Sequence, residues 1–531
     1  MSDVVLPLLV AVPVLAAVAP LCLSLLSSET GWYVAAVTTA IEAGLAAVVL
    51  SSVYGGDRLV HAVGGYPAPY GIELVGDGLS APIVALIAVV SLGVVGFAYT
   101  GGPRRNSFYS AYLLLVGGLM GVSVTGDLFN MFVFLEITGL ATYALVAADR
   151  SGRSAVAALK YLLLGTMGAS FFIIGVGYVF ITTGTLNMID LSERLAGSYA
   201  TRPVLAAFGF VLVGLGLKAA IFPLHTWQPD AYTYASDTVT TFVSALVSTV
   251  AAYAIGRVIL TVFTTSFLAA VPLARTAVVG FASVSVLAGG ALAVVQTDVK
   301  RMFAYSSVSQ FGLVVAAFAL ATPDSVLGGV VHLVGHGLMK GGLFAAAAIL
   351  AATHGARTVD DYARLGYRSP VVAGVVAVLG IALVGVPPSI GFLGKYYIAV
   401  GAVRAGAWPL AAVVFFSTLL TLAYVARLLE RLYFASPNAA PDRASGALAD
   451  GGAATPTSGP TSAPAPSPSP PSDPDAADDT APDEGDTRTV RGVSTGMVLL
   501  TVLAAVAVVA LGFANAGFET LLDPFLGGAL P

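Results

Sequence analysis

The chain has 531 residues, of which 57% are hydrophobic and only 10% are charged, and its formal net charge is −5. Apolar runs long enough to cross a bilayer recur along its length, and this composition excludes a soluble globular protein. The single cysteine, Cys22, excludes an intramolecular disulfide framework and a cysteine-ligated iron–sulfur cluster or cysteine-rich zinc site. We therefore expect an all-α polytopic membrane protein without a redox centre of that kind.

The hydrophobic pattern predicts about fourteen membrane spans, and the first is expected to remain because no basic segment precedes it. The spans are expected near 4–26, 32–53, 80–100, 107–124, 128–148, 156–183, 203–222, 238–262, 276–295, 303–322, 326–352, 371–404, 408–428 and 494–514. Alternate loops are rich in basic residues, such as Arg104, Arg105, Lys300 and Arg301. By the positive-inside rule, this bias predicts a multi-pass protein of the plasma membrane with both termini outside.

Two of these spans are interrupted by proline, the seventh at Pro223 and the twelfth at Pro387 and Pro388. Broken spans in corresponding positions are typical of inverted repeats with an ion site at their interface. We predict helices 1–3 in 1–106, inverted five-helix repeats (helices 4–8 and 9–13) in 107–262 and 276–430, and helix 14 in 494–531. A linker at 431–493 joins the second repeat to helix 14, and its Pro- and Asp-rich part begins near 436. We expect this linker to be disordered and cytoplasmic.

Lysine is rare in this chain, and three of its five lysines, Lys218, Lys340 and Lys395, lie within apolar runs. A lysine at the bilayer centre costs roughly 2.5–3.5 kcal/mol on insertion scales, which marks it as a functional candidate. An ammonium group can lose its proton inside a protein, whereas a guanidinium effectively cannot. GC-rich coding or salt adaptation explains arginine in the loops, but it does not explain three lysines inside the membrane. The pattern therefore favours a proton relay.

The fifth span, GDLFNMFVFLEITGLATYALVA, carries Glu136 near its middle. A membrane glutamate and a nearby lysine can exchange a proton as water access changes, so Glu136 is a candidate for proton handling together with a lysine. The alternative is a structural hydrogen bond from a neighbouring helix or from Thr138 or Thr142. A second membrane carboxylate, Glu42 in the second span, receives no assigned role.

The eleventh span, HLVGHGLMKGGLF, places His332, His336 and Lys340 at successive spacings of four residues. They therefore share one helical face and extend over about 12 Å of helix. One alternative is a metal site, although no HExxH glutamate and no nearby Cys or Asp accompanies the histidines. Another is that both histidines are hydrogen-bonded interior residues with no part in transport.

Lys395 follows two glycines in GVPPSIGFLGKYYIAV, where a second backbone or water can approach closely. The alternative is a lysine that snorkels to the membrane surface. His225, in FPLHTWQPD, is expected to line the break after Lys218. It is a further candidate for loading Lys218 with protons from the cytoplasm, and a purely structural role in this loop is an equal alternative.

Five motifs carry a family resemblance: TGDLFNMFVFLEITGLATYAL, LKAAIFPLHTWQPDAY, DVKRMFAYSSVSQFGL, HLVGHGLMKGGLF and GVPPSIGFLGKYY. From about 106 to 431 the chain resembles the antiporter-like subunits shared by Mrp-type Na⁺/H⁺ antiporters and respiratory complex I. The GDLFN opening and a lysine at Lys395 look most like the D-type subunit of Mrp antiporters. The resemblance implies a proton path through Glu136 and Lys218 and then through His332, His336, Lys340 and Lys395. It also implies a hetero-oligomer with other Mrp subunits.

One departure from the family pattern lies in the eighth span, where the family usually places a lysine or histidine that links the two halves. Here VSALVSTVAAYAIGR offers only Ser244, Ser248 and Thr249. The leading hypothesis is a secondary transporter subunit, without cofactor or metal, that couples proton movement to sodium export. The alternative is a proton-pumping membrane subunit of a complex I-like or hydrogenase-like redox complex. A third hypothesis is an inert scaffold that retains the fold.

Overall fold

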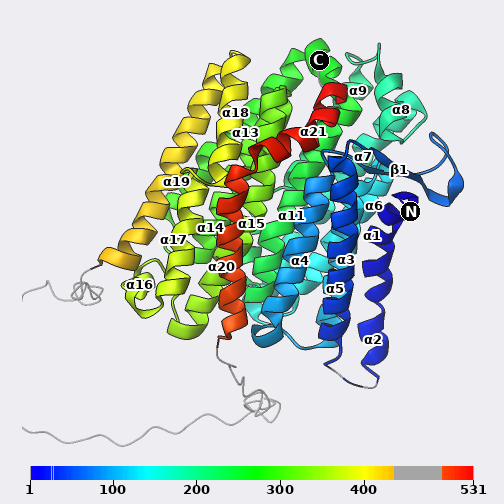
Figure 1. The fold of residues 1–531 in the computed structure, drawn as a ribbon. Helices are drawn as coiled ribbons and strands as arrows, with labels where there is room; N and C mark the ends of the chain where they lie inside the picture. The colour runs from blue at the N-terminus through cyan, green and yellow to red at the C-terminus, as the bar shows by residue number, and fades with distance from the viewer. Residues whose placement is uncertain (1, 26, 28, 436–492, 530–531) are drawn as a thin grey trace, which may run out of the picture. The chain divides into compact units, whose positions relative to one another are not determined.

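The computed structural model describes residues 2–25, 27, 29–435 and 493–529 (Figure 1). Within this part of the chain, twelve helical segments are long and apolar enough to cross a membrane. The predicted all-α polytopic architecture is confirmed, while the count of fourteen spans and the two inverted repeats stay predictions. The predicted linker at 436–492 lies outside the described residues, and α19 continues to Phe434, slightly beyond the predicted start of that linker.

The N-terminal part contains α1 (Ser2–Ala16), α2 (Ala19–Leu23), α3 (Gly31–Tyr54), β1 (Leu59–Ala62), β2 (Glu73–Gly76), α4 (Ala81–Gly101), α5 (Asn106–Val124), α6 (Leu128–Ala147), α7 (Gly152–Thr183), α8 (Met188–Leu195) and α9 (Arg202–Lys218). The middle contains α10 (Gln228–Tyr234), α11 (Asp237–Arg257), a π-helical turn (Val258–Phe263), α12 (Thr264–Ala270), α13 (Pro272–Val295), α14 (Val299–Leu320) and α15 (Pro323–His354). The remainder contains α16 (Leu365–Arg368), α17 (Pro370–Val384), α18 (Ile390–Arg404), α19 (Trp408–Phe434), α20 (Thr495–Ala510) and α21 (Asn515–Ala529), and short 3₁₀ turns cover Val63–Gly65, Asp360–Tyr362 and Leu511–Phe513.

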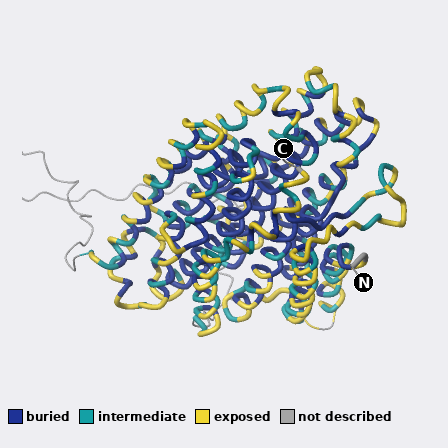
Figure 2. Tube along the Cα trace, turned by 45° about the horizontal axis from the view of Figure 1, so that its top comes forward, coloured by how far each residue is buried: buried dark blue, intermediate teal, exposed yellow. Residues whose placement is uncertain are grey.

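Three long helices, α11, α14 and α15, form the buried centre of the bundle (Figure 2). About nine-tenths of each apolar window is buried in these helices, against about a third in the peripheral helices α13 and α19. The glycines of α15 allow the close approach, because a Cβ on Gly337 would lie 3.0 Å from the carbonyl oxygen of Ala245 in α11. The residues that the sequence marks on the eleventh span therefore lie at the centre of the protein.

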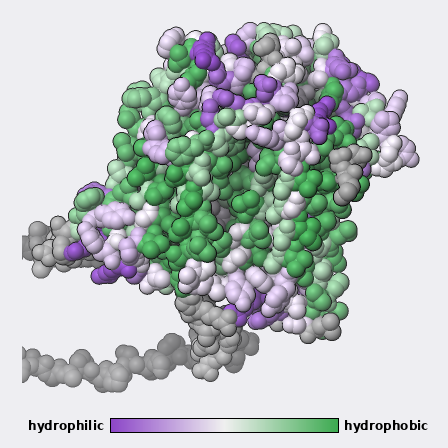
Figure 3. All heavy atoms as spheres, viewed as in Figure 1, coloured by the Kyte–Doolittle hydropathy of each residue, from purple (hydrophilic) through white to green (hydrophobic). Residues whose placement is uncertain are grey.

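The two ends of the bundle differ. One end, the hairpin face, carries the antiparallel pair of β1 and β2 together with α8 and α21, whose residues surround a shared cavity. The opposite face carries α10 and α16. Between the two ends the visible surface is mostly hydrophobic, with hydrophilic residues gathered towards the ends (Figure 3). This distribution is what a chain embedded in a bilayer requires.

Both predicted interruptions are present. The seventh span was expected to reach residue 222, but α9 ends at Lys218, because Ala220 adopts a left-handed φ of 57° that helix geometry does not allow. The chain then turns through 219–227 and continues as α10. The twelfth span ends at Val384, where Gly385 takes a φ of 95°, and resumes as α18 at Ile390. Each interruption lies beside a lysine.

Candidate functional site

The first group of site residues is the ion pair that joins α9 to α6. Lys218 is the last residue of α9, and its Nζ donates to Oε1 of Glu136 at 2.8 Å and to the carbonyl oxygen of Leu135 at 3.4 Å. The side chain of Lys218 is 7% exposed, whereas that of Glu136 is 25% exposed. This contact brings together the two residues that the family resemblance places on one proton path, and it lies at the point where α9 ends.

A tyrosine approaches the same ammonium. A Cβ on Gly139 would lie 2.9 Å from the hydroxyl oxygen of Tyr143 and 3.1 Å from Nζ of Lys218, so both polar atoms crowd this glycine. The hydroxyl of Tyr143 is buried and has no hydrogen-bond partner among the described residues. Gly139 thus leaves room for the ammonium, and Tyr143 offers it a neighbouring polar atom besides Glu136.

The second group of site residues lies on α15. His332, His336 and Lys340 are all fully buried, as their common face predicts. A ring nitrogen of His332, Nε2, is 2.9 Å from Oε1 of Gln310 on α14, and the ring of His336 contacts that of Phe311 with centroids 4.7 Å apart. Neither ring nitrogen of His336 has a partner within the described part of the chain. His332 thus has a hydrogen bond of the kind that the interior interpretation expects, and for His336 both interpretations stay predictions.

Lys340 is held by α14 rather than by a carboxylate. Its Nζ donates to the carbonyl oxygen of Phe303 at 2.8 Å and to the hydroxyl of Ser306, and it lies 5.6 Å from the centroid of the Phe303 ring. Both hydrogen-bond partners are neutral, and among the described residues no carboxylate forms an ion pair with Lys340.

Lys395 forms hydrogen bonds with the end of α17, where the twelfth span is interrupted. The last carbonyl groups of a helix lack partners within that helix, and here two of them, on Leu383 and Val384, accept from Nζ of Lys395 at 3.1 and 3.0 Å. The residue is 5% exposed, so its ammonium stays inside the bundle instead of snorkelling to an end of the helix. The preceding Gly394 packs against the backbone of His332, which brings α18 onto the face of α15 that carries the histidines.

Two further residues that the sequence singled out, His225 and Glu42, lie outside the two groups of site residues described above. His225 lies in the break between α9 and α10, is 6% exposed, and its ring contacts the rings of Phe222 and Tyr305. Glu42 on α3 is fully buried, and neither carboxyl oxygen has a partner among the described residues. Its role stays unassigned.

The alternative of a metal site gains no support. Within the described ranges, no group of three or more His, Cys, Asp or Glu side chains is arranged to hold a metal ion. The rings of His332 and His336 have their centroids 6.5 Å apart, and amide, aromatic and lysine groups surround them. The prediction that this span holds no metal therefore stays a prediction.

Sequence reasoning missed two sets of buried polar residues. In the first, Nε2 of Gln228 donates to Oγ of Ser248 at 3.0 Å and to the hydroxyl of Tyr232 at 3.0 Å, and all three residues are fully buried. In the second, Arg257 at the end of α11 pairs with Asp77 before α4. The signal for the second was present, because Arg257 interrupts the apolar run VSTVAAYAIGRVILTVF. An arginine within such a run is as costly as the lysines that the sequence analysis did single out.

A bundle with twelve membrane-length helical segments that also encloses a glutamate, lysines and histidines, and in which two shorter helices end beside a lysine, defines a polytopic ion-translocating membrane protein. Residues 125–421 match the family described as NADH:quinone oxidoreductase/Mrp antiporter, TM, and the chain belongs to this family. The predicted family is therefore confirmed.

Relatives occur on both sides of this family. The chain is 40% identical over 434 residues to NADH-quinone oxidoreductase subunit N of Desulforudis audaxviator, which covers 80% of this chain and 86% of that protein. It is 30% identical over 406 residues to the D-type subunit of the Na(+)/H(+) antiporter of Bacillus subtilis, which covers 76% of this chain and 82% of that protein. A chain of the Mrp complex from Dietzia sp. DQ12-45-1b has the same fold, with a TM-score of 0.82, 23% identity and coverage of 100% of this chain and 99% of that one.

Proposed function

We propose that this protein is a proton-translocating subunit of a multisubunit cation/proton antiporter, with Na⁺ as the coupled cation. Protons pass through Glu136 and Lys218, then through the set of His332, His336, Lys340 and Lys395, with His225 as a further candidate at the entrance. The observation that carries the proposal is the 2.8 Å contact between the ammonium of Lys218 and the carboxylate of Glu136 at a broken membrane segment.

The physical argument is electrostatic. In a medium of low dielectric constant an ion pair is strongly favoured, and its separation leaves two charges that are stabilised only by gaining water or by transferring a proton. Lys218 ends its helix and lies beside the hydroxyl of Tyr143, so its ammonium can leave Glu136 without losing every polar neighbour. Opening and closing of this pair therefore couples water access to proton exchange.

Several observations support the assembly and the membrane orientation that we propose. The chain shares its fold with a subunit of a multisubunit complex, which supports a hetero-oligomer with other Mrp-type subunits.

Basic side chains of the opposite face, including Lys160, Lys300 and Arg301, pair there with Asp230 and Asp237. By the positive-inside rule that face is cytoplasmic, the hairpin face is external, and the protein lies in the plasma membrane with both termini outside. The chain acts as a secondary transporter subunit and not as an enzyme.

A second candidate function is favoured by the 40% identity to a subunit named for NADH-quinone oxidoreductase. In that case the same buried residues would move protons, and electron transfer in other chains would drive them. Purification of the intact complex distinguishes the two functions. Small antiporter-type partners and sodium-dependent flux support the first, whereas partners with iron–sulfur clusters and quinone-dependent flux support the second.

The test is sodium-dependent proton flux in everted vesicles that contain the whole complex. We expect Glu136→Gln and Lys218→Ala to abolish the flux while the complex still assembles, because each removes one partner of the buried pair. Lys160→Ala is the matched control, since it breaks a lysine–carboxylate pair of 2.7 Å at the surface of the opposite face. Full flux in either relay variant would defeat the assignment of that residue. Full flux in variants of all four charged groups, Glu136, Lys218, Lys340 and Lys395, would support the inert scaffold.

A further inference from the structure

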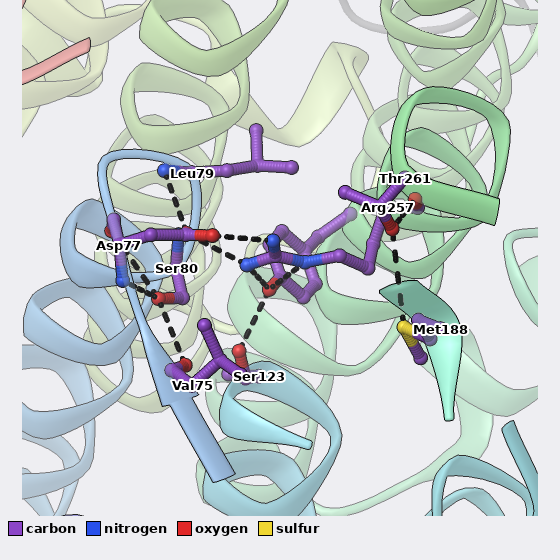
Figure 4. A network of polar contacts seen from close by, with 9 residues as sticks. Val75, Asp77, Leu79, Ser80, Ser123, Met188, Arg257 and Thr261 are labelled. Atoms are coloured by element: carbon purple, nitrogen blue, oxygen red, sulfur yellow. Dashed lines mark hydrogen bonds and ion pairs between the residues drawn. The ribbon is translucent and has the colours of Figure 1, made fainter. Parts of the chain in front are cut away.

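A second buried ion pair lies at the hairpin face, outside the proposed relay (Figure 4). The guanidinium of Arg257 donates to both carboxylate oxygens of Asp77, from Nη1 to Oδ2 at 2.6 Å and from Nη2 to Oδ1 at 2.8 Å. Asp77 also accepts from the backbone amides of Leu79 and Ser80, which fixes the carboxylate at the start of α4. The side chains of Arg257 and Asp77 are 6% and 11% exposed. A bidentate ion pair of this kind fixes the relative orientation of the guanidinium and the carboxylate.

A tyrosine extends this pair into the bundle. The hydroxyl of Tyr253 accepts from Nε and Nη2 of Arg257 at 3.0 and 2.8 Å, and it donates to the carbonyl oxygen of Ser123 at 2.7 Å. Directly after Arg257 the chain forms the π-helical turn, a rare geometry that is frequent at functional sites. Buried ion pairs contribute little to stability on average, so one so fully hydrogen-bonded is a candidate for another role.

The pair lines a cavity of about 280 Å³ whose other charged residues are Asp57, Arg58 and Glu73. A neighbouring cavity of about 320 Å³ shares Arg58 and Glu73 and adds Asp190 and Glu193. Carboxylates therefore outnumber basic groups along this opening. An acidic mouth of this kind raises the local concentration of protons and other cations.

On the inner side, α11 carries a series of buried polar residues, which we call the stripe. In Thr241, Ser244 and Thr249 the hydroxyl donates to a backbone carbonyl of α11 itself. The stripe consists of Thr241, Ser244, Ser248, Thr249, Tyr253 and Arg257, all of them buried. It extends over roughly 24 Å at 1.5 Å per residue, which approaches the hydrocarbon thickness of about 30 Å. Ser248 in the middle of the stripe accepts from Gln228, and Ala245 of α11 packs against Gly337 and Gly341 of α15, the helix that also carries Lys340. The stripe therefore lies between the packing face of α15 and the acidic cavity at its Arg257 end.

We propose that the polar stripe of α11 forms the hairpin-face end of the proton path, and that Asp77 is its last proton-exchanging group before the cavity. This inference rests on the proposed function. A proton that reaches the carboxylate of Asp77 converts it to a neutral carboxyl group and weakens its contact with Arg257. Release of that proton to water in the open cavity restores the ion pair. Arg257 is the positioning residue, because its positive charge keeps the carboxylate ionised and favours release.

The absence of a lysine or histidine from the eighth span gains a physical explanation in this scheme. In α11 the hydroxyl groups and the terminal ion pair direct protons along the helix towards the hairpin face. The eighth span therefore carries hydroxyl groups where the family usually places a lysine or histidine.

The experiment measures proton flux in vesicles that contain the whole complex with the double variant Asp77→Asn/Arg257→Gln. This variant removes both charges, keeps the size of the side chain at Asp77, shortens the side chain at Arg257 and leaves no unpaired charge behind. We expect flux to fall by about tenfold or more, because positioned proton-transferring groups commonly contribute factors of 10² or more. A double variant that assembles and retains full flux would overturn the proposal, since a merely structural ion pair can be replaced by a neutral pair.

Two further variants complete the design. Asp77→Glu keeps a carboxylate, and we expect it to retain most of the flux even if the double variant fails to assemble. Equal loss in Asp77→Glu and Asp77→Asn would contradict proton exchange at this position. The control is Asp324→Asn/Arg404→Gln, which removes an exposed ion pair of 2.8 Å at the ends of α15 and α18. Loss of flux in Glu136→Gln together with full flux in the Asp77 double variant would overturn this inference and leave the proposed function standing.

Discussion

The close crossing of α15 and α18 positions Lys395 beside His332. Adding one methyl group at the crossing, in Gly394→Ala, tests whether this close approach matters. In Gly394→Ala the new Cβ would lie 2.6 Å from Cβ, 2.7 Å from Cα and 2.8 Å from N of His332. Carbon atoms in favourable contact are about 3.5–4.0 Å apart, so the two helices have to separate by roughly 1 Å. Overpacking of this kind costs about 1–3 kcal/mol, of which about 1 kcal/mol is offset by the better helix propensity of alanine.

Gly394→Ala is therefore expected to lower the thermal stability of the purified complex modestly and to reduce proton flux by about tenfold or more, since a misplacement near 1 Å disrupts proton-transfer geometry. Gly374→Ala is the matched control, because nothing lies within 4 Å of the Cβ that it would add to α17. This control should be as stable as the unmodified chain or slightly more stable, with full flux. A Gly394→Ala variant that behaved like Gly374→Ala in both measurements would refute the reasoning about this crossing.

Two other expectations follow from the charged groups. Lys395→Met should abolish proton flux. It should also destabilise the complex by about 1–3 kcal/mol, because the carbonyl oxygens of Leu383 and Val384 lose their donor. A thermal-shift measurement and a flux assay check these two effects, and unchanged flux would contradict the first. Burial raises the pKa of Asp77, but the adjacent Arg257 outweighs this, with Ser80 and Arg58 adding to its effect, so that the pKa lies below its ordinary value. The stabilisation that the ionised Asp77 carboxylate gives the folded protein is present above about pH 4 and is lost as the pH falls through the lowered pKa. The stability of Asp77→Asn/Arg257→Gln should therefore fall less at acid pH than that of the unmodified chain. An identical dependence of stability on pH would contradict this.

The sequence predicted the relay residues because charge inside an apolar run is rare and costly. Glu136 and Lys218 were each singled out on that ground, the family resemblance placed them on one proton path, and the structure shows them in contact. The breaks were predictable for a similar reason, since proline removes a backbone donor and ends a helix. The end of α9 was misplaced by four residues, because Ala220 ends it through its backbone conformation rather than through its residue type.

Contacts between distant helices could not be predicted in the same way. The partners of Lys340, the carbonyl of Phe303 and the hydroxyl of Ser306, are ordinary groups that become significant only because α14 crosses α15 there. Asp77 and Arg257 are 180 residues apart in the chain. Asp77 looks like a loop residue and Arg257 like the end of a span, so neither suggests the other. The short strands β1 and β2 were missed as well, because four residues each carry too little periodicity to be recognised.

The most direct measurement for the central claim is proton flux in the variant Lys218→Arg. Arginine keeps the positive charge and can keep the contact with Glu136, but its guanidinium does not release a proton under these conditions. If Lys218 hands on its own proton, the complex should assemble normally and sodium-dependent proton flux should be lost. Flux at the level of the unmodified complex would show that only the charge at Lys218 matters, and it would contradict a relay through this residue.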